Sequence, residues 1–297
     1  MTDRTTAHPR TGEIEVDGAR LPYRIEGRGQ PCLVLGSVAY YSRVFSQSLR
    51  DHLQLVFVDL RHFAASDSAF SPDAVSIDLY TADVERVRQV LGLDDVVVIG
   101  HSVHATIALE FARRYPAHVR GVVMVGSSPV GIDDEDRAAD DQYWREASED
   151  RRTLRARTKA ELTPELKASL APSDYFVREY VAAAPLHWYD MTYDGTWLWE
   201  GTELNMPVLE RLYAAVDHLT LAAGEVTTPV LIVHGRYDYG SPPVLWDRHR
   251  EKLPVHTFVL FDKSGHTPPL EEPELVDETL LAWIGALEPA RGGSPAS

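Results

Sequence analysis

A serine in the stretch VVVIGHSVHA is a candidate nucleophile. Ser102 follows an apolar run that is typical of a buried strand, and a helical pattern begins directly after it. A serine hydroxyl attacks a carbonyl carbon only when a base takes its proton and the backbone presents it freely. A tight strand-to-helix turn provides that presentation and aims backbone N–H groups at the place where an oxyanion would form. The stretch therefore predicts a nucleophile turn centred on Ser102.

Two further residues are suited to act as the base and as the group that orients it. Asp238 follows the apolar run LIVHG, and His266 follows the run FVLF and precedes the last helical segment. Loops at the carboxyl ends of parallel strands converge on one crevice. We therefore expect Asp238 to hold the imidazole of His266 in one tautomer, and His266 to accept the proton of Ser102.

Apolar runs that alternate with helical periods must position these residues. The runs are too uniformly apolar for half-exposed strands, and buried parallel strands have this composition because helices cover both faces of their sheet. The alternation predicts a doubly wound α/β sheet with right-handed crossovers. The runs lie at residues 32–36, 53–60, 95–100, 121–127, 229–235 and 256–262. Ahead of them, residues 12–27 alternate around Asp17-Gly18, which is typical of a hairpin.

Residues 130–225 break this alternation. They are helical and charged at first and then aromatic, and they hold four of the six tryptophans. We predict that they form an inserted helical cap. The core then comprises residues 1–129 and 226–297, in which 1–11 and 288–297 are expected to be disordered tails.

Together these segments resemble the α/β-hydrolase superfamily over residues 12–287. Five segments occur in the order and spacing of that family: the opening hairpin, VDLRHFAASD, IGHSVHATIALEFARRYPAHVRGVVMVGSSP, PVLIVHGRYD and SGHTPPLEEPE. The resemblance implies an α/β-hydrolase fold with a mostly parallel sheet. It also implies the triad Ser102, Asp238 and His266 and a cap that shapes the substrate pocket.

The chain departs from the family pattern in the loop after the third strand, where members commonly carry His-Gly. Here Gly-Ser stands at residues 36–37. By this alignment the backbone N–H groups of Val38 and Val103 are expected to form the oxyanion hole, and backbone donors do not depend on side-chain identity. Tyr40 and Tyr41, in the same loop, either line the substrate site or pack on a helix or the cap.

Two further departures replace glycines. His62 and Ala64 lie in the DLRHFAASD segment, where we expect a local change of shape. His104 stands two residues after the serine, where glycine is usual because the next helix packs closely on the sheet. Its imidazole is either a half-buried structural group or a functional group that donates to the substrate or tunes Ser102.

Aromatic residues of the cap indicate the kind of substrate. Trp188 and Trp197 are candidates for contact with a bulky or apolar acyl group, although such residues also form the core of a cap. His187 beside them either contacts the substrate or packs. His101 and His234 are assigned structural roles.

These features predict a serine hydrolase that cleaves a carboxylic ester, a thioester or a lactone of a small, apolar or aromatic substrate through an acyl-enzyme on Ser102. Serine here argues against the related dehalogenases and epoxide hydrolases, which attack with aspartate. The chain also lacks the G-G-S-W-G-type turn of proline iminopeptidases. Two alternatives stay open. One is a lyase, C–C hydrolase, acyltransferase or cyclase with the same triad, and the other is a receptor-like binding protein with slow turnover.

Composition limits the partners and the location. A net charge of −16 disfavours nucleic acid and anionic membranes as partners. The single cysteine, Cys32, excludes an intramolecular disulfide and fits a reducing cytoplasm. We find no signal peptide and no membrane span in the sequence, so we expect a cytoplasmic protein. We also find no zinc-ligand spacing and no nucleotide-binding loop, so we expect no cofactor and no metal. The expected partner is a small-molecule substrate, and a homodimer stays open.

Overall fold

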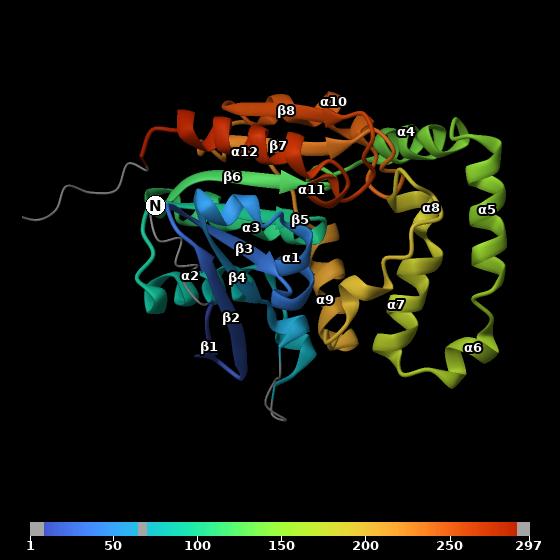
Figure 1. Cartoon of the computed structure of the whole chain (residues 1–297), viewed down its shortest axis with the longest axis horizontal. Helices are drawn as coiled ribbons and strands as arrows, with labels where there is room; N and C mark the ends of the chain where they lie inside the picture. The colour runs from blue at the N-terminus through green and yellow to red at the C-terminus, as the bar shows by residue number, and fades with distance from the viewer. Residues whose placement is uncertain (1–8, 65–69, 290–297) are drawn as a thin grey trace, which may run out of the picture.

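A central sheet of eight strands organises the protein, and helices cover both of its faces (Figure 1). The computed structural model describes residues 9–64 and 70–289. The strand order is β1-β2-β4-β3-β5-β6-β7-β8. The strands are β1 (Arg10–Val16), β2 (Ala19–Gly27), β3 (Gln30–Gly36), β4 (Leu53–Asp59), β5 (Val96–His101), β6 (Val119–Val125), β7 (Val230–Gly235) and β8 (His256–Phe261). The pairs β1–β2 and β2–β4 are antiparallel and the other five are parallel, which confirms the predicted α/β-hydrolase sheet.

The helices fall into a group that packs on the sheet and a group inserted between β6 and β7. The first group is α1 (Val38–Val44), α2 (Ile77–Leu91), α3 (Val103–Arg114), α10 (Trp246–His249), α11 (Pro268–Glu271) and α12 (Pro273–Ala286). The inserted group is α4 (Asp134–Arg145), α5 (Glu149–Ala160), α6 (Pro164–Ser169), α7 (Pro172–Ala182), α8 (Ala184–His187) and α9 (Met206–Asp217). Short 3₁₀ turns lie at Ser48–Asp51, Arg61–Phe63, Pro72–Ala74, Pro116–His118, Thr196–Trp199, Pro243–Leu245 and Arg250–Lys252.

Two apolar cores lie on opposite faces of the sheet because side chains alternate along each strand. In β3, Leu33 and Leu35 pack in the core that contains α2 and α3, whereas Cys32 and Val34 pack in the core that contains α1 and α12. Every strand residue from 32 to 36 is buried. The uniformly apolar runs of the sequence follow from this double coverage.

The amino-terminal hairpin begins earlier than we expected. Arg10 and Thr11, assigned above to a tail, are part of β1 because they pair with Ile25 and Arg24 of β2. Gly18 makes the turn with φ 73°. The other residues expected to form tails lie outside the described residues, apart from residues 9 and 288–289, and so does the end of the DLRHFAASD segment.

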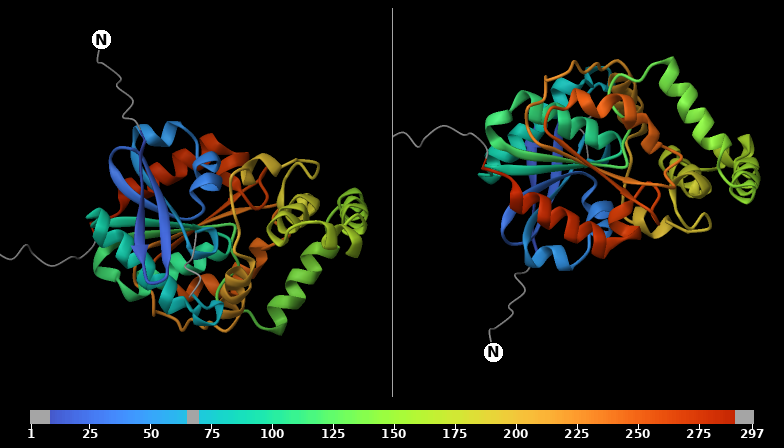
Figure 2. Two further views of the ribbon diagram at one scale, coloured as in Figure 1. Left: turned by 90° about the horizontal axis from the view of Figure 1, so that it is seen from below. Right: turned by 90° about the horizontal axis from the view of Figure 1, so that it is seen from above.

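The inserted helices α4 to α8 lie beyond the carboxyl ends of the parallel strands, toward which the arrows of Figure 1 point. The two views of Figure 2 show α5 to α7 standing to one side of the sheet. Helix α9 is different, since Leu209 and Leu212 pack in the same core as α2 and α3. Within the described part of the chain, no helix is long and apolar enough to cross a membrane.

Candidate active site

Ser102 stands in a strained turn between β5 and α3. Its backbone has φ 55° and ψ −130°, a conformation that side-chain-bearing residues rarely adopt and that often marks functional sites. The Ser102 N–H is fixed by a 2.9 Å hydrogen bond to the Val125 carbonyl. Gly100 makes the turn possible, because a Cβ there would lie 2.3 Å from the His104 carbonyl oxygen and 2.5 Å from the Ala105 nitrogen. The sequence therefore builds the predicted nucleophile turn.

His266 is oriented by Asp238, as the sequence predicted. The imidazole Nδ1 lies 2.8 Å from Asp238 Oδ2, and the N–H groups of Gly240 and Ser241 donate to Asp238 Oδ1 at 3.0 and 2.8 Å. Burial raises the pKa of Asp238, but the neighbouring His266 and these hydrogen bonds outweigh it and hold that pKa below its usual value. The ionised carboxylate only accepts hydrogen bonds. His266 therefore carries its proton on Nδ1 and keeps Nε2 as a base.

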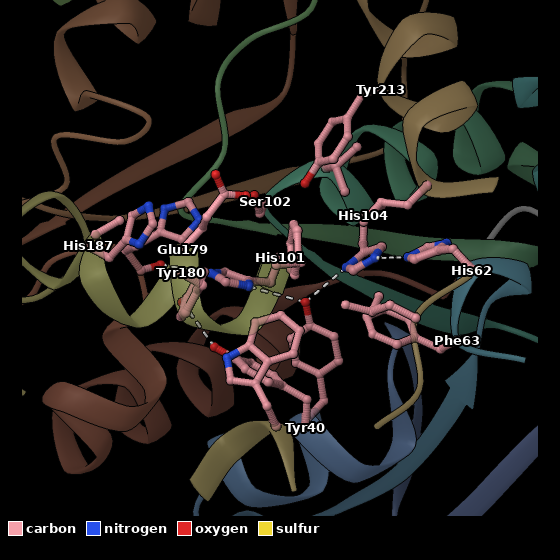
Figure 3. A pocket seen from close by; sticks show the side chains of 18 of the residues that line it. Tyr40, His62, Phe63, His101, Ser102, His104, Glu179, Tyr180, His187 and Tyr213 are labelled. Carbon is pink, nitrogen blue, oxygen red and sulfur yellow. Dashed lines mark hydrogen bonds between the residues drawn. The ribbon is translucent and has the colours of Figure 1, made fainter. Parts of the chain in front are cut away.

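Ser102 and His266 line the same cavity, whose volume is about 320 Å³. Figure 3 shows Ser102 among the side chains of its wall. Much of its wall is aromatic. These residues are Tyr40, Tyr41, Phe63, Phe176, Tyr180, Trp199 and Tyr213. The cavity lies between the carboxyl end of β5 and the inserted helices, which is where loops of an open α/β sheet converge.

The expected oxyanion hole is half supported. Val103 opens α3, where the first N–H groups have no acceptor within the helix. Val38 was a wrong prediction, because its N–H donates to Asp59 Oδ1 at 2.5 Å. Burial raises the pKa of Asp59 to about 7, against the effect of this hydrogen bond.

Ser37 supplies a better-placed N–H than Val38. The Gly36 carbonyl accepts the Leu60 N–H on the β4 side, so the Ser37 N–H of the same trans peptide points toward β5. No hydrogen bond among the described residues uses the Ser37 N–H. Gly36 has φ 135°, which suits the glycine of the family's His-Gly pair, and that alignment would have indicated Ser37.

The aromatic candidates divide into those that line the cavity and those that do not. Tyr40 and Tyr41 line it. Trp188 is 1% exposed and packs in the core with α1 and α12, and Trp197 is 40% exposed with its Nε1 donating to Tyr193. Neither tryptophan lines the cavity, so both predictions were wrong. Trp199 does line it, in a 3₁₀ turn whose orientation no helical period in the sequence indicates.

The two histidines that replace glycines contact each other. His104 Nε2 and His62 Nε2 lie 2.9 Å apart, and both rings line the cavity. His187 also lines it, and its Nδ1 is buried without a hydrogen-bond partner among the described residues. Across residues 9–64 and 70–289, no three His, Cys, Asp or Glu side chains are grouped so as to hold a metal ion.

The sheet, the inserted helices and the strained serine turn are the features of the α/β hydrolases, and the chain belongs to that family. The family model described as "alpha/beta hydrolase fold" matches residues 30–273. The chain is similar to the AB hydrolase superfamily protein YclE of Bacillus subtilis (strain 168), with 38% identity over 93% of this chain and 99% of the relative.

More distant relatives differ in their named activities. A proline iminopeptidase of Heyndrickxia coagulans is 24% identical over 92% of this chain and 96% of its own. Among solved structures, a thermophilic esterase from Thermogutta terrifontis has a TM-score of 0.65 and 20% identity, covering 93% of this chain and 98% of the esterase. The fold is therefore common to proteins with different substrates, and the site must decide the reaction.

Proposed function

We propose that this protein is a serine hydrolase that cleaves a carboxylic ester, a thioester or a lactone through an acyl-enzyme on Ser102. One observation carries the proposal. Ser102, in its strained turn, lines the same cavity as His266, and Asp238 orients His266 so that Nε2 is free to act as a base.

In the proposed mechanism, His266 accepts a proton and returns it in each of two half-reactions. Ser102 Oγ attacks the carbonyl carbon while His266 Nε2 takes its proton, and Asp238 stabilises the imidazolium. The N–H groups of Val103 and Ser37 stabilise the oxyanion, and one such donor is typically worth about 3 kcal/mol. His266 then protonates the leaving alcohol or thiol. A water molecule, deprotonated by His266, releases the acid and restores Ser102.

The cavity wall favours a small apolar or aromatic acyl group. Its volume of about 320 Å³ and its aromatic lining suit a compact ring or chain. The buried Nδ1 of His187 is unpartnered, so a polar atom of the substrate placed there would gain a hydrogen bond.

Labelling with a fluorophosphonate tests the proposal, with the adduct located by peptide mass spectrometry. We expect an adduct on Ser102 in the wild type and none in His266→Ala, because the unassisted hydroxyl is a poor nucleophile. A folded wild-type protein without an adduct on Ser102 would overturn the proposal. A positive result justifies kinetic screening of aryl and short-chain esters, thioesters and lactones.

A further inference from the structure

Five buried side chains form a continuous row of hydrogen bonds that ends on the backbone of His266. We call it the imidazole–phenol chain. Its links are Tyr80 OH to His62 Nδ1 at 2.9 Å, His62 Nε2 to His104 Nε2 at 2.9 Å, His104 Nδ1 to Tyr41 OH at 2.9 Å, Tyr41 OH to His101 Nδ1 at 3.2 Å, and His101 Nε2 to the His266 carbonyl oxygen at 2.9 Å. Figure 3 shows the links between His62 and His101. All five side chains are buried.

The hydrogen bond to the His266 carbonyl determines which atom donates and which accepts at every other link of the imidazole–phenol chain. A carbonyl oxygen only accepts, so His101 must carry its proton on Nε2. Burial lowers the pKa of His101 to about 3, so the ring is neutral and its Nδ1 accepts. The Tyr41 hydroxyl therefore donates its single proton to His101 and must accept from His104 Nδ1.

The same reasoning determines the remaining links. Burial holds the pKa of His104 well below its usual value, so this ring is also neutral, and its Nε2 accepts from His62 Nε2. His62, whose pKa burial lowers to about 3, then accepts from the Tyr80 hydroxyl on Nδ1. Each link has one donor and one acceptor. A second proton on His104 would place an N–H on Nε2 directly against the N–H of His62 Nε2, so this link requires His104 to be neutral.

We propose that the imidazole–phenol chain positions His266 for catalysis. This proposal rests on the proposed function, since His266 is the base in that mechanism. The backbone of His266 is held on two sides, because its carbonyl accepts from His101 and its N–H donates to the His187 carbonyl at 2.6 Å. Asp238 holds the side chain. The imidazole–phenol chain thus links helices and turns around the cavity to the loop that carries His266.

His62 and His104 depend on each other, because they share one buried hydrogen bond. Each replaces a glycine of the family pattern, and each satisfies a buried ring nitrogen of the other. A buried nitrogen without a partner is unfavourable, so either histidine alone would be destabilising. We infer that His62, His104, Tyr41 and His101 are positioning residues.

Nuclear magnetic resonance of ¹⁵N-histidine-labelled wild-type protein tests, without any substrate, which ring nitrogens of the imidazole–phenol chain carry the protons. Two-bond ¹⁵N–¹H spectra distinguish the two neutral tautomers. We expect the proton on Nε2 in His101 and His62 and on Nδ1 in His104 at neutral pH. Single His→Gln variants assign the signals. A His104 ring that is protonated on Nε2, or that is cationic at neutral pH, would overturn the proposal.

Tyr41→Phe tests the effect on the reaction, because it removes the hydroxyl that joins His104 to His101 and keeps the ring. We expect Ser102 labelling and kcat to fall about tenfold, the effect of roughly one lost buried hydrogen bond. KM should change less than about twofold, whereas loss of a substrate contact would raise KM. The matched control is Tyr175→Phe, which removes the hydroxyl of a buried tyrosine that belongs neither to the cavity wall nor to the imidazole–phenol chain.

The outcomes separate the two proposals. If the wild type is not labelled on Ser102, the proposed function fails while the tautomers can still be read. If the wild type is labelled and Tyr41→Phe is labelled at the same rate with the same kcat, the positioning role is wrong. If Tyr41→Phe does not fold, the tautomers of the wild type decide the direction of the chain, and kinetics of His101→Gln decide the role.

Discussion

Asp238 is fully buried, yet its pKa lies below that of an ordinary aspartate. Burial alone would raise that pKa, but His266 Nδ1 and the N–H groups of Gly240 and Ser241 all point at its two oxygens. These donors stabilise the charged form. At the level of single residues, hydrogen bonds therefore decide the charge of this carboxyl group, and the charge decides the tautomer of His266.

Asp238→Asn is predicted to lower kcat and the rate of Ser102 labelling by about 10⁴-fold, because the amide no longer enforces the Nδ1–H tautomer of His266. The Nε2 of His266 then carries the proton and cannot act as a base. Labelling kinetics measure the loss, with circular dichroism to show that the variant folds. Wild-type labelling of Asp238→Asn would contradict the role of this residue.

The turn after β4 is held in place by a buried ion pair. Arg61 donates from Nε and Nη2 to the two oxygens of Asp83 in α2, at 2.5 and 2.8 Å, and its Nη1 donates to the Asp17 carbonyl at 2.6 Å. Arg61 is fully buried. This pair fixes the 3₁₀ turn that carries His62, so an element without catalytic groups helps to position the imidazole–phenol chain.

Arg61→Met is predicted to destabilise the protein by about 3–5 kcal/mol, because it leaves the carboxylate of Asp83 buried without its partner. Urea denaturation measures the change in the free energy of unfolding. The double variant Arg61→Met/Asp83→Leu serves as the control and should recover most of the loss, since it removes both charges. A loss below about 1 kcal/mol in Arg61→Met would show that the pair is not important for stability.

On the scale of the whole molecule, polar side chains join the inserted helices to the core. Glu271 of α11 accepts the N–H of Tyr189 in the insertion and the N–H of Gly265 next to His266, at 2.7 and 2.8 Å. Within the insertion itself, Arg151 of α5 donates to the carbonyls of Pro185 and Trp188, each at 2.8 Å, and so holds α5 against the segment that Glu271 contacts. The roof of the cavity is thus tied to the loop that carries His266.

Buried titratable groups make the stability of the molecule depend on pH. Burial lowers the pKa of five histidines below the ordinary value of 6.5, so unfolding takes up protons below about pH 6.5. They are His62, His101, His104, His187 and His234. Burial raises the pKa of Asp59 and Glu271 to about 7, and these two groups release protons on unfolding in the same range.

We predict that the protein is less stable at about pH 5 than at about pH 7. Burial also raises the pKa of Asp83 and Asp140, so four carboxyl groups oppose the five histidines. The histidines still outnumber them, so the unfolded chain binds more protons than the native one in this window, and stability falls as pH falls. Thermal unfolding at the two pH values measures the effect. A Tm that is equal or higher at about pH 5 would contradict it.

The sequence by itself determined the alternation of buried strands and helices, the insertion after β6, and the order of Ser102, Asp238 and His266. These features depend on periodicity and on local turns, which neighbouring residues encode. Only the tertiary structure paired His62 with His104, occupied the Val38 N–H with Asp59, and placed Trp199 instead of Trp188 or Trp197 at the cavity. Such contacts join residues far apart in the chain. Burial patterns show that a residue is inside, but they do not show which partner meets it there.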